Sequence, residues 1–405
     1  MRATSRSYKG QLKDGTALSV AVEHGCITHI TPIASDNALP YLLPVLVDLQ
    51  HNGALGHAFT DTCQCGAEGL REVATLIRQH GVGRCLPTLI TAPADTLNRS
   101  VAHFDAALQA DTDLQRLYRG LFHEGVYISP QDGWRGVHDL RWVAPPDAAA
   151  LAALDTLSGN RIRIVNVAPE GPGGLDFIRQ TVDAGKIVSL GHCNPDAATV
   201  HRAADAGATM VTHFGNGAAS PLPRFDNPLW AMLNEPRLRL GMIGDGFHLP
   251  PDLVGTALRV RHADNCFFVS DAASLSGCPP GRYEDTYADP CVIEPNGHLH
   301  IADSPMLAGA WFQLDRSVEW LVQTQGLTLH EAWRLCSEIP ARILGEPLPE
   351  IEVGAEASFV LARWDQGLII EQSVHNGQAY LDTPSRPTDC GKSNTKTGEK
   401  NEHGS

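Results

Sequence analysis

The chain has 405 residues, enough for one domain of barrel size and a second, smaller one. Hydrophobic residues make up 43% of it and charged residues 19%, which is typical of a globular protein. The formal net charge of -15 argues against a surface that binds nucleic acid or an anionic membrane. The net charge does not exclude a local basic pocket for a phosphorylated small molecule.

The sequence carries no sign of export. Residues 1–10 lack the apolar segment of a secretory signal, and no stretch reaches the roughly 20 apolar residues that a membrane span needs. Of the ten cysteines, the closest pair is Cys63 and Cys65, and no second pair stands at zinc-finger spacing. We therefore expect a cytoplasmic protein with reduced thiols and with neither a membrane nor a nucleic acid as partner.

Both ends of the chain have the pattern of β-strands. Residues 18–33 contain two β-type runs around a His-Gly turn, and residues 357–364 and 369–381 are again strand-like. We expect residues 1–45 and 346–385 to meet in one small β-sandwich domain. Residues 386–405 are polar and lack apolar periodicity, so they are expected to form a disordered tail.

The middle of the chain, residues 46–345, alternates strand-like and helix-like runs. Amphipathic runs such as 69–81 and 96–109 predict helices. The runs that predict strands number eight: 43–53, 83–91, 117–125, 161–170, 187–190, 208–212, 237–249 and 265–272. Eight strands with intervening helices predict an α/β fold, a (β/α)8 TIM-like barrel. No G-x-G-x-x-G or P-loop stands at a strand end, which disfavours nucleotide-binding folds.

Polar, ligand-type residues stand at the ends of five of these predicted strands. They are Glu124, His192, His213, His248 and Asp271. In a β/α barrel the carboxyl ends of the strands meet at one mouth, where the active site lies. Two imidazoles and a carboxylate form a common ligand set for a catalytic divalent ion. A single histidine of this kind is more often a hydrogen-bonded core residue, but five such strand ends favour a site.

Asp271 follows the apolar run CFFVS, which would deliver its carboxylate to that mouth. Beside an activated water molecule, such a group can take a proton and hand it to a leaving amine. The alternative is a carboxylate that only orients a neighbouring histidine.

The motifs together resemble the N-acetylglucosamine-6-phosphate deacetylases of the amidohydrolase superfamily. The resemblance runs from about residue 43 to residue 381. Its most specific pieces, in chain order, are HEG at Glu124, GHCNPD at His192, THFGNG at His213, GDGFH at His248, VSDA at Asp271 and MLAGA at Gly309.

The resemblance implies roles for individual residues. Glu124, His192 and His213 would bind one divalent ion, expected to be zinc, although the same ligands suit Fe2+ or Mn2+. Asp271 would be the catalytic acid and base, and His138 would contact the substrate and polarise the amide carbonyl. The remaining substrate contacts would be Asn216, Gly217, Arg224, His248, Leu307, Ala308 and Gly309. Arg224 is the position most similar to a phosphate-binding arginine that family members supply across a dimer interface, so a homodimer is expected.

The first predicted strand departs from the superfamily pattern. Most amidohydrolases carry His-x-His there for a second ion, whereas this chain has Gln50, His51 and Asn52. Amides are poor zinc ligands, so a single ion is expected. His51 alternates to the other face of the strand and is expected to be structural.

Other departures lie on the substrate side. Val126 replaces the family's usual proline, THFGNGAAS differs from the usual histidine loop, and the segment around Arg224 aligns loosely. The expected function is removal of the N-acetyl group from an amino-sugar phosphate, most simply N-acetylglucosamine-6-phosphate. Two alternatives stay open: an amidohydrolase for a different N-acyl sugar or amide, and a catalytically silent sugar-binding barrel.

Overall fold

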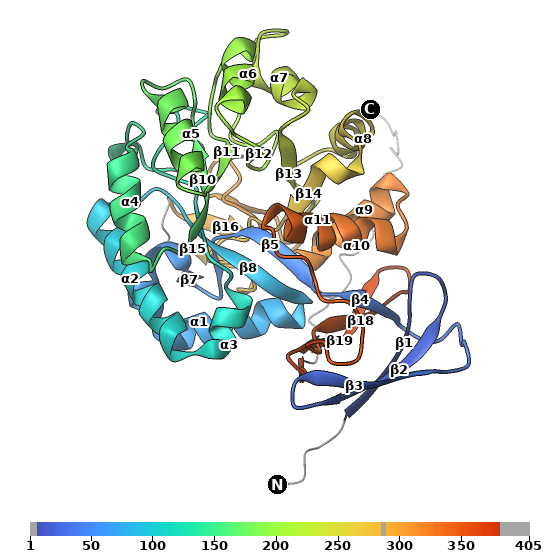
Figure 1. The fold of residues 1–405 in the computed structure, drawn as a ribbon. Coiled ribbons are helices and arrows are strands. Elements are labelled where there is room, and N and C mark those ends of the chain that lie inside the picture. The colour runs from blue at the N-terminus through green and yellow to red at the C-terminus, as the bar shows by residue number, and fades with distance from the viewer. Residues whose placement is uncertain (1–5, 285–288, 381–405) are drawn as a thin grey trace, which may run out of the picture.

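The computed structural model describes residues 6–284 and 289–380. Its centre is a parallel sheet of eight strands that follow one another around a barrel in chain order (Figure 1). The strands are β5 (Leu46–His51), β8 (Val82–Leu89), β9 (Leu121–His123), β10 (Ile162–Val167), β11 (Ile187–Leu190), β12 (Met210–Val211), β13 (Arg239–Ile243) and β14 (Cys266–Val269). The predicted (β/α)8 barrel is confirmed.

The barrel closes where β14 meets β5. The backbone N–H of Asp271 donates to the carbonyl of Gln50 over 3.0 Å, and that of Asn52 donates to Ala272 over 2.8 Å. The buried carboxylate of Asp48 accepts a hydrogen bond from the Ser270 backbone N–H over 3.1 Å. The first and last strands are thus tied together at the level of the predicted site residues.

Seven of the eight barrel strands are shorter than the runs that predicted them, and only β11 matches its run. β12 holds only Met210–Val211 of the predicted run 208–212, and β10 ends at Val167 although its run continues to 170. A strand ends at its last hydrogen bond to a neighbouring strand, and the apolar pattern of the sequence does not show where that hydrogen bond lies.

Helices surround the barrel and connect its strands. They are α1 (Thr62–Gln79), α2 (Ala94–Ala110), α3 (Thr112–Leu117), α4 (Ala148–Leu157), α5 (Gly174–Asp183), α6 (Ala197–Asp205), α7 (Pro228–Asn234), α8 (Pro251–Arg261), α9 (Asp315–Gln325), α10 (Leu329–Leu335) and α11 (Glu338–Ile343). Local sequence sets several of their starts. The Asp196 side chain caps α6 by accepting from the Thr199 N–H, and Thr328 with Glu331 forms a capping box on α10.

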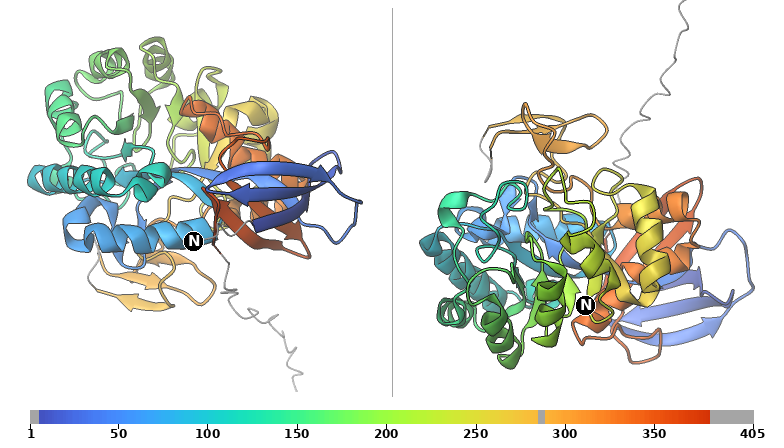
Figure 2. Two further views of the ribbon diagram at one scale, coloured as in Figure 1. Left: turned by 60° about the horizontal axis from the view of Figure 1, so that its bottom comes forward. Right: turned by 90° about the horizontal axis from the view of Figure 1, so that it is seen from above.

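A second, seven-stranded sheet draws on both ends of the chain. Its order is β20-β19-β18-β4-β1-β2-β3. The strands are β1 (Arg6–Gln11), β2 (Ala17–Glu23), β3 (Cys26–Pro32), β4 (Tyr41–Pro44), β18 (Phe359–Trp364), β19 (Leu368–His375) and β20 (Gln378–Tyr380). Its two halves lie one over the other (Figure 2) and share a core that includes Val20, Ile27 and Phe359. The small β domain expected from both chain ends is present.

Smaller elements complete the described chain. A three-stranded sheet, β15 (Gly281–Tyr283), β16 (Cys291–Ile293) and β17 (Leu299–Ile301), is inserted between β14 and α9. The short strands β6 (Gly53–Ala54) and β7 (His57–Ala58) form a hairpin, and the 3-10 turns are η1 (Phe59–Asp61), η2 (Leu140–Trp142) and η3 (Ala263–Asn265). No helix in the described part of the chain is both long and apolar enough to cross a membrane.

The domain boundaries near residues 45 and 345 remain a prediction. The expected disordered tail, 386–405, lies outside the described residues.

Candidate active site

Three of the predicted site residues share an unusual backbone conformation just beyond their strands. His192, His213 and Asp271 have φ values of 50°, 31° and 49°. Residues other than glycine seldom adopt positive φ, and such strain concentrates at functional sites. The left-handed turn occurs at the same point after β11, β12 and β14, and all three side chains are buried.

Glu124, His192 and His213 come together as a compact buried cluster. Their exposed fractions are 2%, 7% and 3%, and one potential ligand atom from each lies within 4.8 Å of the others. The Nε2 atom of His213 lies 3.0 Å from Glu124 Oε1 and 3.0 Å from His192 Nε2. Two ring nitrogens and a carboxylate oxygen therefore converge on one point, as the ligands of a metal ion do.

The hydrogen bonds and charges around the cluster leave its ligand atoms suited to a cation. His192 Nδ1 lies 2.9 Å from the Trp134 carbonyl and can only donate to it, which leaves the Nε2 lone pair for a ligand. Burial alone would raise the pKa of Glu124, but hydrogen bonds and positive charge from the two histidines hold it below its usual range. Burial alone would lower the pKa of His213, but Glu124 raises it. A buried carboxylate that draws positive charge fits a divalent metal site.

Asp271 lies beside this cluster and is held by two amides. Its Oδ1 atom accepts hydrogen bonds from Gln50 Nε2 over 3.0 Å and from Asn52 Nδ2 over 2.8 Å. Gln50 Nε2 also donates to Glu124 Oε1 over 2.8 Å. Burial, reinforced by the negative charge of Glu124, raises the pKa of Asp271, which suits a proton acceptor. Gln50 thus links Asp271 to Glu124, and Asn52 adds a second donor to Asp271.

His138 lies against His192, with the two ring centroids 4.5 Å apart. The Thr91 backbone N–H donates to His138 Nδ1 over 3.3 Å, and the Thr91 hydroxyl lies 2.8 Å from the same nitrogen. With Nδ1 as the acceptor of both, the ring proton sits on Nε2. Burial lowers the pKa of His138 to about 3, which keeps the ring neutral. The side chain can therefore offer an N–H to a carbonyl oxygen beside the cluster.

Asn166 supports the cluster from inside the barrel. Its Nδ2 donates to the carbonyls of Glu124 and Gly191 over 3.1 Å each, and its Oδ1 accepts from Thr212 Oγ1 over 2.9 Å. The Thr212 hydroxyl in turn lies 2.6 Å from Ser189 Oγ. This amide links the Glu124 backbone to the residues that directly precede His192 and His213. Sequence reasoning missed it, although a lone amide in the apolar run 161–170 was a signal.

Several predicted substrate contacts lie next to the cluster. Gly217 has a φ of 61°, and a Cβ there would lie 2.7 Å from His192 Nδ1, so only glycine fits. The backbone of Asn216 donates to the His213 carbonyl over 2.8 Å, and its side-chain Nδ2 is buried without a partner among the described residues. His248 Nδ1 lies 2.7 Å from Asp245 Oδ2.

The segment Leu307, Ala308 and Gly309 leads to Asp271. The Ala310 N–H donates to the Asp271 carbonyl over 2.9 Å, and a Cβ on Gly309 would lie 3.1 Å from that same oxygen. These residues thus lie at the mouth near the predicted acid and base.

Arg224 is not joined to the cluster. It lies on the exposed loop between β12 and α7, with its guanidinium carbon 5.9 Å from the centroid of the Phe225 ring, and Phe225 is 81% exposed. No hydrogen bond or ion pair among the described residues connects Arg224 to the site. His51 is buried on the opposite face of β5, with Nε2 3.1 Å from Gln313 Oε1. That contact fits the structural role expected for it.

In sequence the chain is similar to sugar-phosphate deacetylases, although no family model matches it. It is 29% identical over 351 residues to N-acetylglucosamine-6-phosphate deacetylase of Bos taurus, covering 84% of this chain and 82% of that protein. It is 28% identical over 362 residues to N-acetylgalactosamine-6-phosphate deacetylase of Escherichia coli O157:H7, covering 88% and 93%.

A solved structure shares the whole fold. It is a mutant N-acetyl-D-glucosamine-6-phosphate deacetylase of Mycobacterium smegmatis in complex with N-acetyl-D-glucosamine-6-phosphate, with a TM-score of 0.82 at 23% identity over 93% of this chain and 99% of that one. The sequence relatives confirm the resemblance indicated by the motifs, and the structural match confirms the fold.

Proposed function

We propose that this relative of the N-acetylglucosamine-6-phosphate deacetylases hydrolyses the N-acetyl amide of a phosphorylated amino sugar, most simply N-acetylglucosamine-6-phosphate, to the free amine and acetate. The observation that carries the proposal is the buried Glu124, His192 and His213 cluster with Asp271 beside it. Relatives named as deacetylases of two such sugars support it.

Glu124, His192 and His213 would hold one divalent ion, which we propose to be zinc, with Fe2+ or Mn2+ as alternatives. When bound, the ion would supply Lewis acidity that polarises the acetyl carbonyl and makes a water molecule more acidic. Gln50 and Asn52 occupy the positions of a second ligand pair and donate hydrogen bonds instead. One ion per chain is therefore the proposed stoichiometry.

Asp271 would move the proton. Its Oδ1 is fixed by two amide donors, so Oδ2 is the oxygen that takes the proton of the attacking water. The same carboxyl group then gives the proton to the departing amine. Its raised pKa, caused by burial and by Glu124, makes both transfers accessible near neutral pH.

His138 would stabilise the transition state. Its Nε2–H, with Nδ1 accepting from the Thr91 backbone, would donate to the oxygen that becomes negative during attack on the acetyl group. A neutral imidazole suits this role because it donates without taking charge from the cluster.

We propose that the loop after β12 and the segment that begins at Leu307 bind the substrate. Asn216, Gly217, His248 and residues 307–309 would contact the sugar and its phosphate. Arg224 would reach the phosphate of a neighbouring subunit, which is why we propose a homodimer. The Arg224 guanidinium makes no ion pair in the described chain and is free for such a contact. A cytoplasmic location fits this substrate.

A substrate panel tests the proposal. Purified enzyme, reconstituted with Zn2+, is assayed for acetate release from N-acetylglucosamine-6-phosphate, N-acetylgalactosamine-6-phosphate and unphosphorylated N-acetylglucosamine, with and without a chelator. We expect chelator-sensitive release from a phosphorylated sugar. The galactosamine epimer is the second candidate, because a relative is named for it. Absence of release from both phosphorylated sugars would overturn the proposal and favour another amide substrate or a silent barrel.

A further inference from the structure

The side chain of Asn166, a buried residue of β10, contacts all three chain segments that carry the ligand cluster. Its Nδ2 atom donates hydrogen bonds over 3.1 Å to the carbonyl oxygens of Glu124 and Gly191. Its Oδ1 atom accepts a hydrogen bond over 2.9 Å from the hydroxyl of Thr212. Gly191 and Thr212 directly precede the two histidines of the cluster. One amide group therefore bridges the three segments.

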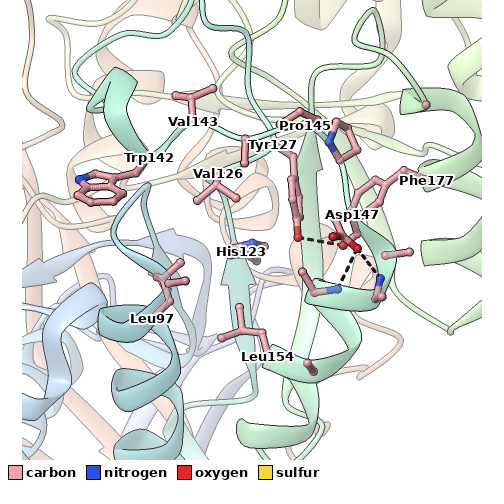
Figure 3. Close-up of a pocket in the computed structure, with 18 of the residues that line it drawn as sticks. Leu97, His123, Val126, Tyr127, Trp142, Val143, Pro145, Asp147, Leu154 and Phe177 are labelled. Carbon is pink, nitrogen blue, oxygen red and sulfur yellow. Dashed lines mark hydrogen bonds between the residues drawn. The ribbon is translucent and has the colours of Figure 1, made fainter.

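Asn166 reaches these segments from the interior of the barrel. Its neighbour Val165 pairs with His123 on β9, and the His123 ring lies among apolar side chains outside the barrel wall (Figure 3). Paired residues of a sheet point to the same face and successive residues to opposite faces, so Val165 faces outward and Asn166 inward. Inside, the hydroxyls of Ser189 and Thr212 lie 2.6 Å apart, which extends the network to β11.

The segments that Asn166 holds contain strained backbone. The two histidines of the cluster, directly after Gly191 and Thr212, have φ values of 50° and 31°. Residues other than glycine keep such conformations only where the surrounding structure fixes them. A Cβ on Gly191 would lie 2.7 Å from Asn166 Oδ1, so glycine is needed for the amide to come this close. Without the amide, both turns could relax and both imidazole rings would move.

We propose that Asn166 is a positioning residue of the metal site, and that its amide sets the affinity of the site for a divalent ion. Its hydrogen bonds fix the backbone that presents Glu124, His192 and His213, so the ligands are ordered during folding rather than on binding. Loss of the amide weakens ion binding although all three ligands remain. The inference rests on the proposed ion site, but not on the proposed substrate or reaction.

Two alanine substitutions on β10 form a matched pair for the test. Asn166 and Val165 are adjacent, both are 0% exposed, and their side chains lie on opposite faces of the strand. The zinc affinity of the metal-free protein is measured by competition with a chromophoric chelator. Asn166→Ala should bind zinc about tenfold to a hundredfold more weakly than the wild type, and Val165→Ala should bind like the wild type. Wild-type affinity in Asn166→Ala would overturn the proposal, and so would an equal loss in both variants.

A spectroscopic measurement separates positioning from a general loss of stability. Co2+ in place of zinc reports the arrangement of its ligands through its visible absorption bands. At saturating Co2+, the bands of Asn166→Ala should differ in position or intensity from those of the wild type and of Val165→Ala. Identical spectra for all three proteins would contradict a positioning role for Asn166.

Thr212→Val offers a milder test, because it keeps nearly the same side-chain shape and removes the hydroxyl that donates to Asn166. Zinc affinity should fall about fivefold, the effect of one hydrogen bond. In the Asn166→Ala background the same substitution should have a smaller effect, because its partner is gone. A loss of equal size in both backgrounds would mean that Thr212 acts independently of Asn166 and would overturn the network. If Asn166→Ala does not fold, Thr212→Val alone carries the test, and unchanged affinity overturns the proposal.

The same titrations separate this inference from the proposed function. Absence of zinc binding by the wild type would overturn the proposed ion site and the role of Asn166 with it. Zinc binding without deacetylation of any sugar in the panel would overturn the proposed reaction and leave the result for Asn166 standing.

Discussion

The two sides of the candidate site differ in how firmly the protein holds them. On the metal side, Glu124, His192 and His213 are buried, and each is joined to a neighbour by a hydrogen bond of about 3 Å. On the substrate side, Arg224 lies in an exposed loop, and its described contacts are with Phe225 and Trp230. The metal-side residues follow strand ends, whereas Arg224 lies in a loop.

This difference separates reaction chemistry from substrate recognition. Groups that must be placed within tenths of an ångström benefit from a rigid support, whereas loops can change without disturbing the barrel. The departure from the family pattern around Arg224 falls on the substrate side, whereas Val126 lies in the hollow outside the barrel wall, between α2, α4 and α5. The proposed reaction type is therefore better supported than the identity of the sugar.

The largest kinetic effect should come from the metal side. Asp271→Asn keeps the shape of the side chain but removes the proton acceptor, so kcat should fall about a thousandfold. Bound metal, measured by atomic emission, should stay at the wild-type level because Asp271 is not in the cluster of three ligands. Retention of about a tenth of the activity would contradict the acid and base role of Asp271.

A smaller and different effect should come from the substrate side. Arg224→Ala should raise KM about tenfold for a phosphorylated sugar while kcat changes little, because it removes a charge-assisted hydrogen bond to phosphate. The same variant should leave KM for the unphosphorylated sugar unchanged. Arg259→Ala, another exposed arginine, is the control. An equal rise in KM for both sugars would show that Arg224 does not bind the phosphate.

The amide pair allows a finer test of the metal side. Asn52→Ala removes one of the two hydrogen bonds to Asp271 Oδ1, so kcat should fall about fivefold to tenfold with unchanged metal content. Gln64→Ala, which alters an exposed amide, should have no effect. A loss of metal in Asn52→Ala would mean that Asn52 supports the ion rather than the carboxylate.

The smallest effect on catalysis is expected at Asp48, a buried residue of β5. A substitution there should change the pH dependence of stability instead. Burial raises its pKa from 3.8 to about 7. Between about pH 4 and about pH 7 the folded state keeps a proton that the unfolded chain loses, so this carboxyl's contribution to stability decreases as pH rises.

Denaturant unfolding of the wild type and of Asp48→Asn at several pH values checks this. The free energy of unfolding of the wild type should decline relative to the variant across that window, by at most about 4 kcal/mol. A parallel pH dependence of the two proteins would show that Asp48 is ionised throughout.

The barrel could be predicted from the sequence because each strand is a buried parallel strand with a nearly continuous apolar run, as in the four buried residues of β14. The ends of the strands could be predicted less well. β12 keeps only two residues, since where the sheet stops depends on ladder bonds to neighbours far away in sequence. Both ends of the chain were expected in one small domain, but the parallel pairing of β1 with β4 inside its sheet leaves no mark in the pattern.

The ligand cluster could be predicted because its residues end strands and sit in recognisable motifs. The links between its members could not. Gln50 and Asn52 were identified only as poor metal ligands, and their hydrogen bonds to Asp271 depend on how β5 and β14 meet when the barrel closes. Thr91 gave no signal at all, because its contact with His138 joins two loops 47 residues apart.

The central claim is that this chain builds a site for one divalent ion from Glu124, His192 and His213. The most direct test is a crystal structure of the Zn2+-reconstituted protein with anomalous scattering at the zinc edge, together with the metal content of the same sample. One ion per chain, bonded to those three side chains and lost in Glu124→Gln, is the predicted result. Two ions, or an ion held by Gln50 and Asn52, would contradict it.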